Sequence, residues 1–216
     1  DYAVEEAVNL ILKKKKPLLI CGGGVRYSEA AKSFAAFAEM FNIPFAETQA
    51  GKSAIEFEHA LNLGGIGVTG NSAANEIAKN ADLIIGVGTR YTDFTTSSKW
   101  LFQNENVDFI NINVSEFQAY KIADAKEGLE AISAALKNKN YISAYTNEIK
   151  IAKDEWQKEL VRLSQTNYKN KGYRPEIADD NVSAVKQYYK DMGSCLTQTR
   201  VLSIINQNIA KDAVVV

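Results

Sequence analysis

Short apolar runs that end in glycine mark the first half of the chain. Residues 18–21 are apolar at every position and stop at Gly22, and residues 83–85 do the same before Gly86. Runs without a polar face are typical of strands that are buried on both sides, as in a parallel sheet. The pattern therefore predicts interior strands of an α/β fold.

Apolar residues at helical spacing separate these runs. They predict a helix over residues 29–41 with Ser28 as its N-cap, and a second helix that ends at Lys79 and is capped by Asn71 or Ser72. Strands that alternate with helices imply right-handed crossovers. The prediction is a doubly wound, Rossmann-like α/β fold with six parallel strands and flanking helices. The remaining expected elements are strands at 43–46, 61–63, 107–112 and 120–123 and a helix at 126–136.

The pattern changes after residue 140. Apolar residues that include Trp156 follow one stripe of a long helix, and residues 165–180 read as a loop. Further helices are expected over residues 182–189 and from Thr197 onward. The expected organisation is one domain over residues 1–140, a helical linker over 141–195 and the truncated start of another domain over 196–216, whose apolar end is read as a first strand.

Composition narrows the chemistry. Lys plus Arg number 25 and Asp plus Glu number 26, so a formal net charge of -1 argues against a nucleic-acid partner. No apolar run is long enough to span a bilayer, so no membrane partner is expected. One histidine, His59, and two distant cysteines, Cys21 and Cys195, argue against a catalytic triad, a zinc site and a disulfide framework. Residues 13–16, all lysines, read as the solvated end of the first helix.

The glycine turns are the candidate ligand-binding elements. Gly22, Gly23 and Gly24 lie between a strand and a helix, where a Rossmann fold holds pyrophosphate, and Glu47 ends the next strand at the place of a ribose-binding acid. Tyr27 occupies the place of the third glycine in the dinucleotide fingerprint. The alternative is a tight strand-to-helix turn without a ligand.

Two more segments complete the candidate crevice. Gly88, Thr89 and Arg90 repeat the strand-end pattern, and Arg90 would clamp an anion or form a surface ion pair. Four glycines within residues 64–70 favour close approach to a ligand, a neighbouring domain or a partner subunit, or else a flexible connector. The candidate crevice residues are Gly22, Gly23, Gly24, Gly65, Thr69, Gly70, Asn71, Gly88, Thr89 and Arg90.

The order of these motifs resembles the central domain of thiamin-diphosphate-dependent enzymes, the acetolactate synthase and pyruvate oxidase superfamily. The shared features cover about residues 1–140. They are three glycines after a strand within residues 21–25, a proline-containing strand and small-residue loop at 43–52, a Leu-Gly-x-x-Gly stretch at 63–67, and a strand that runs into Gly-x-Gly-x-Arg at 81–90, followed by Asp93.

Residues 47–53, 64–71 and 88–96 resemble most closely a hydrolase branch of this superfamily that opens a cyclic 1,2-diketone in inositol catabolism. The resemblance implies cleavage to a deoxy-glucuronate, thiamin diphosphate and magnesium as cofactors of the full-length enzyme, and a cytoplasmic homo-oligomer. It also implies that other domains of the same chain are the partners of this one. Residues 65–71 and 89–95 would line the approach to the active site.

The resemblance assigns no catalytic or metal-binding residue to this chain, because the family carries both in its other domains. Asn111 and Asn113 stand where nucleotide-binding members carry Asp-x-Asp, so bound FAD or ADP is not expected, and residues 113–124 form a shorter stretch than in the family. The leading hypothesis is a scaffold fragment that is inactive alone. The alternatives are another thiamin enzyme, a stand-alone module that binds FAD, NAD or ADP, and a purely structural domain.

Overall fold

The computed structural model describes residues 2–114, 124–166, 182–192, 196–210 and 212–213. The chain forms two compact units, Asp1–Trp156 and Gln157–Val216. Each unit is described by itself. The boundaries expected at residues 140 and 195 stay predictions.

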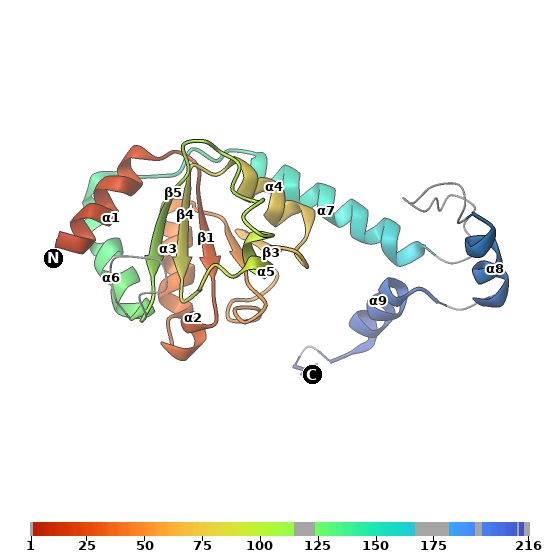
Figure 1. Ribbon diagram of the computed structural model, residues 1–216. Helices are drawn as coiled ribbons and strands as arrows, with labels where there is room; N and C mark the ends of the chain where they lie inside the picture. The colour runs from red at the N-terminus through yellow and green to blue at the C-terminus, as the bar shows by residue number, and fades with distance from the viewer. Residues whose placement is uncertain (1, 115–123, 167–181, 193–195, 211, 214–216) are drawn as a thin grey trace. The chain divides into compact units, whose positions relative to one another are not determined.

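A parallel sheet forms the centre of the first unit (Figure 1). Its strands run in the order β3-β2-β1-β4-β5, so the chain moves outward in one direction from β1 and then in the other from β4. This confirms the doubly wound α/β class, with five strands in the described residues. The sixth predicted strand, at residues 120–123, lies outside them. The bounds are β1 Pro17–Cys21, β2 Phe45–Glu47, β3 Asn62–Gly65, β4 Leu83–Val87 and β5 Asp108–Ile112.

Both faces of the sheet are covered by helices, which explains the apolar runs. Leu19 and Cys21 belong to the core on one face, whereas Leu18 and Ile20 belong to the core on the other. All four are fully buried, because successive side chains of a strand point to opposite faces. No side chain of β1 therefore faces solvent, which accounts for its apolar sequence.

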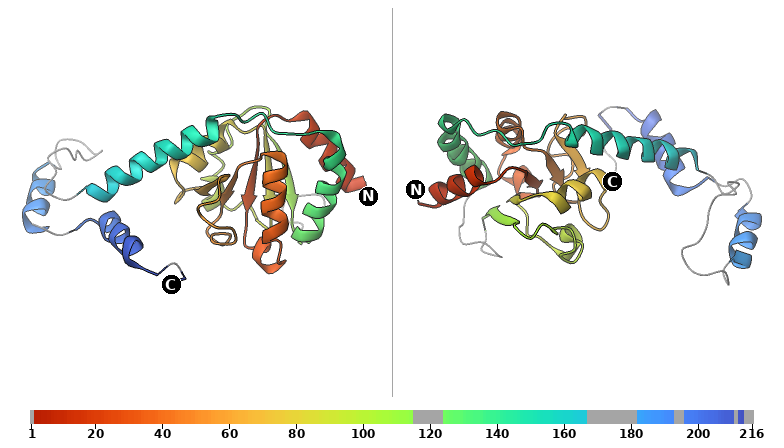
Figure 2. Two further views of the ribbon diagram at one scale, coloured as in Figure 1. Left: turned by 180° about the vertical axis from the view of Figure 1, so that it is seen from behind. Right: turned by 90° about the horizontal axis from the view of Figure 1, so that it is seen from above.

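The helices divide between the two cores (Figure 2). Helices α1, α3 and α6 supply apolar residues to the core of Leu19, and α4 and the start of α7 supply them to the core of Leu18. The bounds are α1 Tyr2–Lys13, α2 Gly24–Tyr27, α3 Ala31–Phe41, α4 Ser72–Asn80, α5 Asp93–Thr96, α6 Ala125–Leu136 and α7 Glu148–Gln165, with a 3₁₀ turn, η1, at Lys137–Lys139.

Helix starts only partly follow the sequence prediction. Asn71 caps α4, as expected, by accepting a hydrogen bond from the Ala74 N–H. Ser28 is not the N-cap of α3. The glycine turn folds into its own short helix, α2, and Ser28 ends it by donating its N–H to Gly24 O, so the chain needs one more turn before α3 begins. Glu29, the first residue of that turn, has a left-handed backbone with φ of 52°.

Lysines after α1 are not all solvated, contrary to prediction. The Lys14 side chain is 12% exposed and its Nζ lies 2.6 Å from an Asp108 carboxylate oxygen. The expectation fails because the segment after α6 lies across this link. Tyr141 donates its hydroxyl to Lys14 O, and the Ala144 N–H donates to Lys15 O.

The second unit contains the end of α7, α8 (Val182–Met192) and α9 (Gln198–Asn208). Thr197 caps α9 by accepting from the Arg200 N–H, as its position in the sequence predicts. Apolar side chains of α9, such as Leu202 and Ile205, are exposed. The apolar residues 214–216, predicted to be a strand, lie outside the described part. No helix within the described ranges has the length and apolar character needed to cross a membrane.

Asp82 fixes the entry of the chain into β1. Its two carboxylate oxygens accept the N–H groups of Lys15 and Lys16, each at 2.8 Å. We expect Asp82→Ala to lower the free energy of unfolding by about 1–3 kcal/mol, because two amides, one of them partly buried, lose their acceptor. Denaturant unfolding followed by circular dichroism measures the change. The control Asp154→Ala removes an exposed carboxylate that pairs with Lys150, and it should change little. Equal losses in the two variants would contradict this role.

Candidate functional site

The glycine turns after β1 and β4 lie against each other. A Cβ added at Gly24 would come 2.6 Å from the Cα of Gly88, and one added at Gly22 would overlap the Gly88 carbonyl. Gly88 also has a left-handed backbone with φ of 61°. The two strands are neighbours at the point where the sheet order reverses, so their turns meet where Rossmann folds bind ligands.

The contact between the turns uses the amide groups that a phosphate would need. Gly22 donates its N–H to Val87 O at 2.9 Å, and Gly24 donates to Gly88 O at 3.0 Å. Helix α2, which follows, has four residues and is too short to supply a strong dipole. These residues therefore do not fit a bound pyrophosphate. Of the two interpretations of the glycine run, the structure favours the tight strand-to-helix turn.

The loop after β2 packs against the carboxyl end of β1, at the same edge of the sheet. Thr48 donates its N–H to Cys21 O, and Gly51 lies so close that an added Cβ would overlap this carbonyl. Ala50 contacts Gly23, where an added Cβ would come 3.1 Å from the alanine Cβ. Backbone therefore fills the space above the end of β1.

Glu47 is buried and does not occupy the exposed position of a ribose-binding acid. The residue pairs in register with Cys21 of β1 and Gly65 of β3, and it is 3% exposed. Its Oε1 atom has no hydrogen-bond partner within the described residues. Burial raises the pKa of the carboxyl above its usual range, and the Lys52 charge and the Asn62 side chain oppose this shift.

The Gly-rich segment, residues 64–71, is a folded turn and not a flexible connector. Asn71 donates its N–H to Gly65 O, Gly70 donates to Gly67 O, and the Asn71 side-chain amide donates to Leu63 O. Gly67 has φ of 98°, a conformation that favours glycine. Thr69 is exposed within this turn.

This segment meets the residues that follow β4. The Val68 N–H donates to Phe94 O at 2.9 Å, and a Cβ on Gly67 would overlap the same carbonyl. The side chains of Val68 and Phe94 are 60% and 61% exposed. The structure thus brings the segment after β3 to the one after β4, while Gly22 and Gly24 contact Gly88 and Gly23 contacts Ala50.

The remaining candidates are divided between surface and scaffold. Arg90 is exposed, and both interpretations of it, anion clamp and surface ion pair, stay predictions. Thr89 is buried, and its carbonyl accepts the Asn113 side-chain amide at 2.9 Å. Asn111 holds a buried Oδ1 without a partner in the described part of the chain. Asn111 and Asn113 carry side-chain amides, so these positions have no carboxylate that could accept hydrogen bonds from ribose hydroxyls.

His59 has a structural role, as a single histidine in a turn suggests. Its Nδ1 accepts the Leu61 N–H, its Nε2 lies 3.0 Å from a Glu39 carboxylate oxygen, and its ring packs on Phe45. Lys153 of α7 donates its ammonium to the His59 carbonyl. These contacts hold the β2–β3 connection in place.

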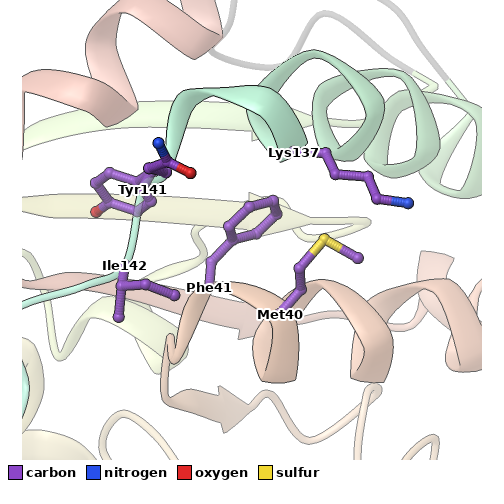
Figure 3. Close-up of a pocket in the computed structure, with 6 residues that line it drawn as sticks. Met40, Phe41, Lys137, Tyr141 and Ile142 are labelled. Atoms are coloured by element: carbon purple, nitrogen blue, oxygen red, sulfur yellow. The ribbon is translucent and has the colours of Figure 1, made fainter.

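A separate hollow of about 350 Å³ lies near the amino ends of the strands, where α3 ends and the chain passes residues 141–142 (Figure 3). Figure 3 shows Met40 and Phe41 on α3 facing the segment that carries Tyr141. The lining is mostly apolar, with Lys137 and Asn140 at its edge. The candidate crevice lies at the carboxyl ends of the strands, which is the opposite edge of the sheet from this hollow.

Asn75 is the residue that sequence reasoning missed. Its side chain accepts the Gly67 N–H and donates to the Gly67 carbonyl, so it clamps the turn of the Gly-rich segment. It follows the cap residue Asn71 by four positions, which places both amides on one face of the first turn of α4. That spacing was a usable signal.

The fold and its turns define a doubly wound α/β domain whose crevice is closed by its own backbone and whose exposed face is built from the segments after β3 and β4. Its sequence matches the family model "Thiamine pyrophosphate enzyme, central domain" over residues 4–136, so the chain belongs to this family.

Three of the similar curated proteins share one name. A protein of Clostridium tetani (strain Massachusetts / E88) named 3D-(3,5/4)-trihydroxycyclohexane-1,2-dione hydrolase is 60% identical over 220 residues. Proteins of the same name from Bacillus anthracis (strain A0248) and Bacillus cereus (strain AH820) are 54% identical over 220 residues. Each alignment covers 99% of this chain and 34% of the relative, so the chain spans about a third of their length.

Gly88 should tolerate no side chain. We expect Gly88→Ala to cost about 2–5 kcal/mol of unfolding free energy, because the residue is left-handed and its Cβ would overlap Gly24. Gly65→Ala is the matched control. Gly65 does not have a positive φ, and its added Cβ would meet nothing closer than Gly70 Cα at 3.8 Å, so a change within about 0.5 kcal/mol is expected. Urea unfolding of both variants decides; a harmless Gly88→Ala would rule out the close contact.

Proposed function

We propose that the protein to which this chain belongs hydrolyses 3D-(3,5/4)-trihydroxycyclohexane-1,2-dione to 5-deoxy-glucuronate in inositol catabolism. One water is added as the carbon–carbon bond between the two carbonyl carbons breaks, so that one carbon becomes a carboxylic acid and the other an aldehyde. The observation that carries this proposal is the 60% identity to a relative of that name, across 99% of this chain. A cytoplasmic homo-oligomer is part of the proposal.

Thiamin diphosphate with magnesium is the proposed cofactor of the full-length protein. It supplies the carbanion stabilisation that cleavage between two carbonyl carbons requires. The described residues do not fit its metal-diphosphate end, because they contain no group of three or more His, Cys, Asp or Glu side chains placed to hold a metal ion. We therefore assign no cofactor ligand to this chain.

The role that we propose for this chain is to shape one wall of the substrate approach. Residues 65–71 and 89–95 are joined through the Val68–Phe94 hydrogen bond and present exposed apolar side chains beside Arg90. In this role the scaffold orients and shields the substrate, and the reacting groups come from other parts of the protein. A nucleotide-binding module is disfavoured because Gly22 and Gly24 already donate their amides within the fold.

Turnover by the full-length protein tests the proposal. We expect it to convert the dione to 5-deoxy-glucuronate only when thiamin diphosphate and a divalent cation are added, and we expect the 216-residue chain alone to be inactive under the same conditions. Product formation is followed by mass spectrometry. Activity of the isolated chain, or a full-length protein that condenses two pyruvates and leaves the dione intact, would contradict the assignment.

Phe94→Ala in the full-length enzyme tests whether residues 65–71 and 89–95 form a wall of the substrate approach. The exposed ring is removed, while the Phe94 carbonyl that holds Val68 stays. We expect kcat/KM for the dione to fall about tenfold, the equivalent of about 1.4 kcal/mol. Ile151→Ala, which trims another exposed apolar side chain, is the control and should stay within about twofold. Unchanged kinetics in Phe94→Ala would remove this face from the active site.

A further inference from the structure

The end of β2 holds a buried acid whose desolvation is only partly offset by the Lys52 charge and by hydrogen bonds from Asn62 and the Ser53 backbone. Glu47 pairs in register with Cys21 of β1 and Gly65 of β3, so strands flank it on both sides. The residue is 3% exposed, and its Oε1 atom has no hydrogen-bond donor in the described part of the chain. An ionised carboxylate with an unsatisfied oxygen is strongly disfavoured in such a place, whereas a neutral acid is tolerated.

The groups that face Glu47 do not neutralise it. On the β1 side lies the Cys21 thiol, whose pKa is raised to about 12, chiefly by burial, so it stays uncharged near neutral pH. On the loop after β2 lies Lys52, which is exposed; Arg26 of α2 donates its guanidinium to the Lys52 carbonyl. On the β3 side lie Asn62 and Gly65, which carry no charge. The side chains of Lys52 and Arg26 are both exposed to solvent.

The same acid adjoins the bonds that begin the Gly-rich segment. Its backbone carbonyl accepts the Ile66 N–H at 3.0 Å. The Asn62 side chain, which faces the carboxyl, accepts the Gly64 N–H at 2.8 Å and donates to Glu56 O at 3.2 Å. The β2–β3 register also shifts between Phe45 and Glu47, so few ladder bonds secure this junction. Asn62 is therefore a shared neighbour of the Glu47 carboxyl and of Gly64, while Ile66 is bonded to the backbone of the same acid.

We infer that Glu47 is a positioning residue that carries a proton in the folded protein, and that its ionisation loosens the start of the Gly-rich segment, residues 64–71. Once ionised, the carboxylate would draw in water or turn toward Lys52, and either change withdraws it from Asn62. For catalysis the inference rests on the proposed function, since residues 65–71 line the proposed substrate approach.

The direction with pH follows from burial. Because the pKa of Glu47 is raised in the folded state, its stabilising effect is complete at pH values below the unfolded pKa and is lost as the pH rises through the folded pKa. Alkaline conditions should therefore release the segment. Glu47→Gln, which keeps the shape and cannot ionise, should remove this dependence.

Amide hydrogen exchange of the isotope-labelled chain between pH 5 and pH 9 tests the inference, with rates corrected for intrinsic exchange. We expect protection of the Ile66 amide to fall at least tenfold over this range in the wild type and to change less than twofold in Glu47→Gln. Glu56→Gln, which removes an exposed acid of the same connection, is the matched control and should behave as the wild type. Protection of the Ile85 amide in the central strand should stay constant in all three.

Three results would overturn the inference. One is equal loss of protection in the wild type and Glu47→Gln; another is equal loss at Ile66 and Ile85, which would mean global unfolding. The third needs no variant. It is an NMR titration of the Glu47 carboxyl carbon in the wild type that shows the carboxyl already ionised at pH 5. In the full-length enzyme, KM should rise at alkaline pH in the wild type and not in Glu47→Gln. If exchange behaves as expected and KM does not, residues 65–71 do not line the substrate approach and the positioning role within this chain stands; if the dione is not turned over at all, the proposed function fails.

Discussion

The contact between the glycine turns after β1 and β4 is the constraint on which the rest of this domain depends. β1 and β4 are neighbours, but the segments that follow them lead to opposite faces of the sheet. The two turns therefore pass each other with their backbones in direct contact. Only residues without a side chain fit there, and Gly22, Gly24 and Gly88 satisfy the condition. The same contact lets β1 be buried on both faces and thereby sets the apolar character of the central strands.

Closing this crevice has a chemical consequence. Amides that would cradle a phosphate are used within the fold, and the acid at the end of β2 lies beneath the surface, where a ribose could not reach it. The exposed polar and apolar groups are instead displaced outward, to the segments joined by Val68 and Phe94. One architecture can thus keep the Rossmann-like arrangement of its strands while its exposed groups lie elsewhere, because function depends on the site and not on the fold.

The chain belongs to a family of central domains and spans about a third of the length of its relatives. A central domain that spans about a third of its relatives' length is expected to present surfaces to the rest of the protein. Glu47 connects this scaffold role to chemistry, since a buried acid beside a poorly laddered strand junction links the state of one proton to the order of an exposed segment.

The sequence by itself determined the layered α/β class, the positions of the described strands, the cap at Asn71 and the family. These depend on local periodicity and on motifs that are contiguous in the chain. It did not determine that Ser28 ends a helix, that Lys14 is covered or that Glu47 is buried. Those outcomes were decided by the tertiary structure, because burial and hydrogen-bond donors at one position depend on which distant segment packs there. Asp108, Gly88 and Gly65 lie far from their partners along the chain, and no local pattern carries that information.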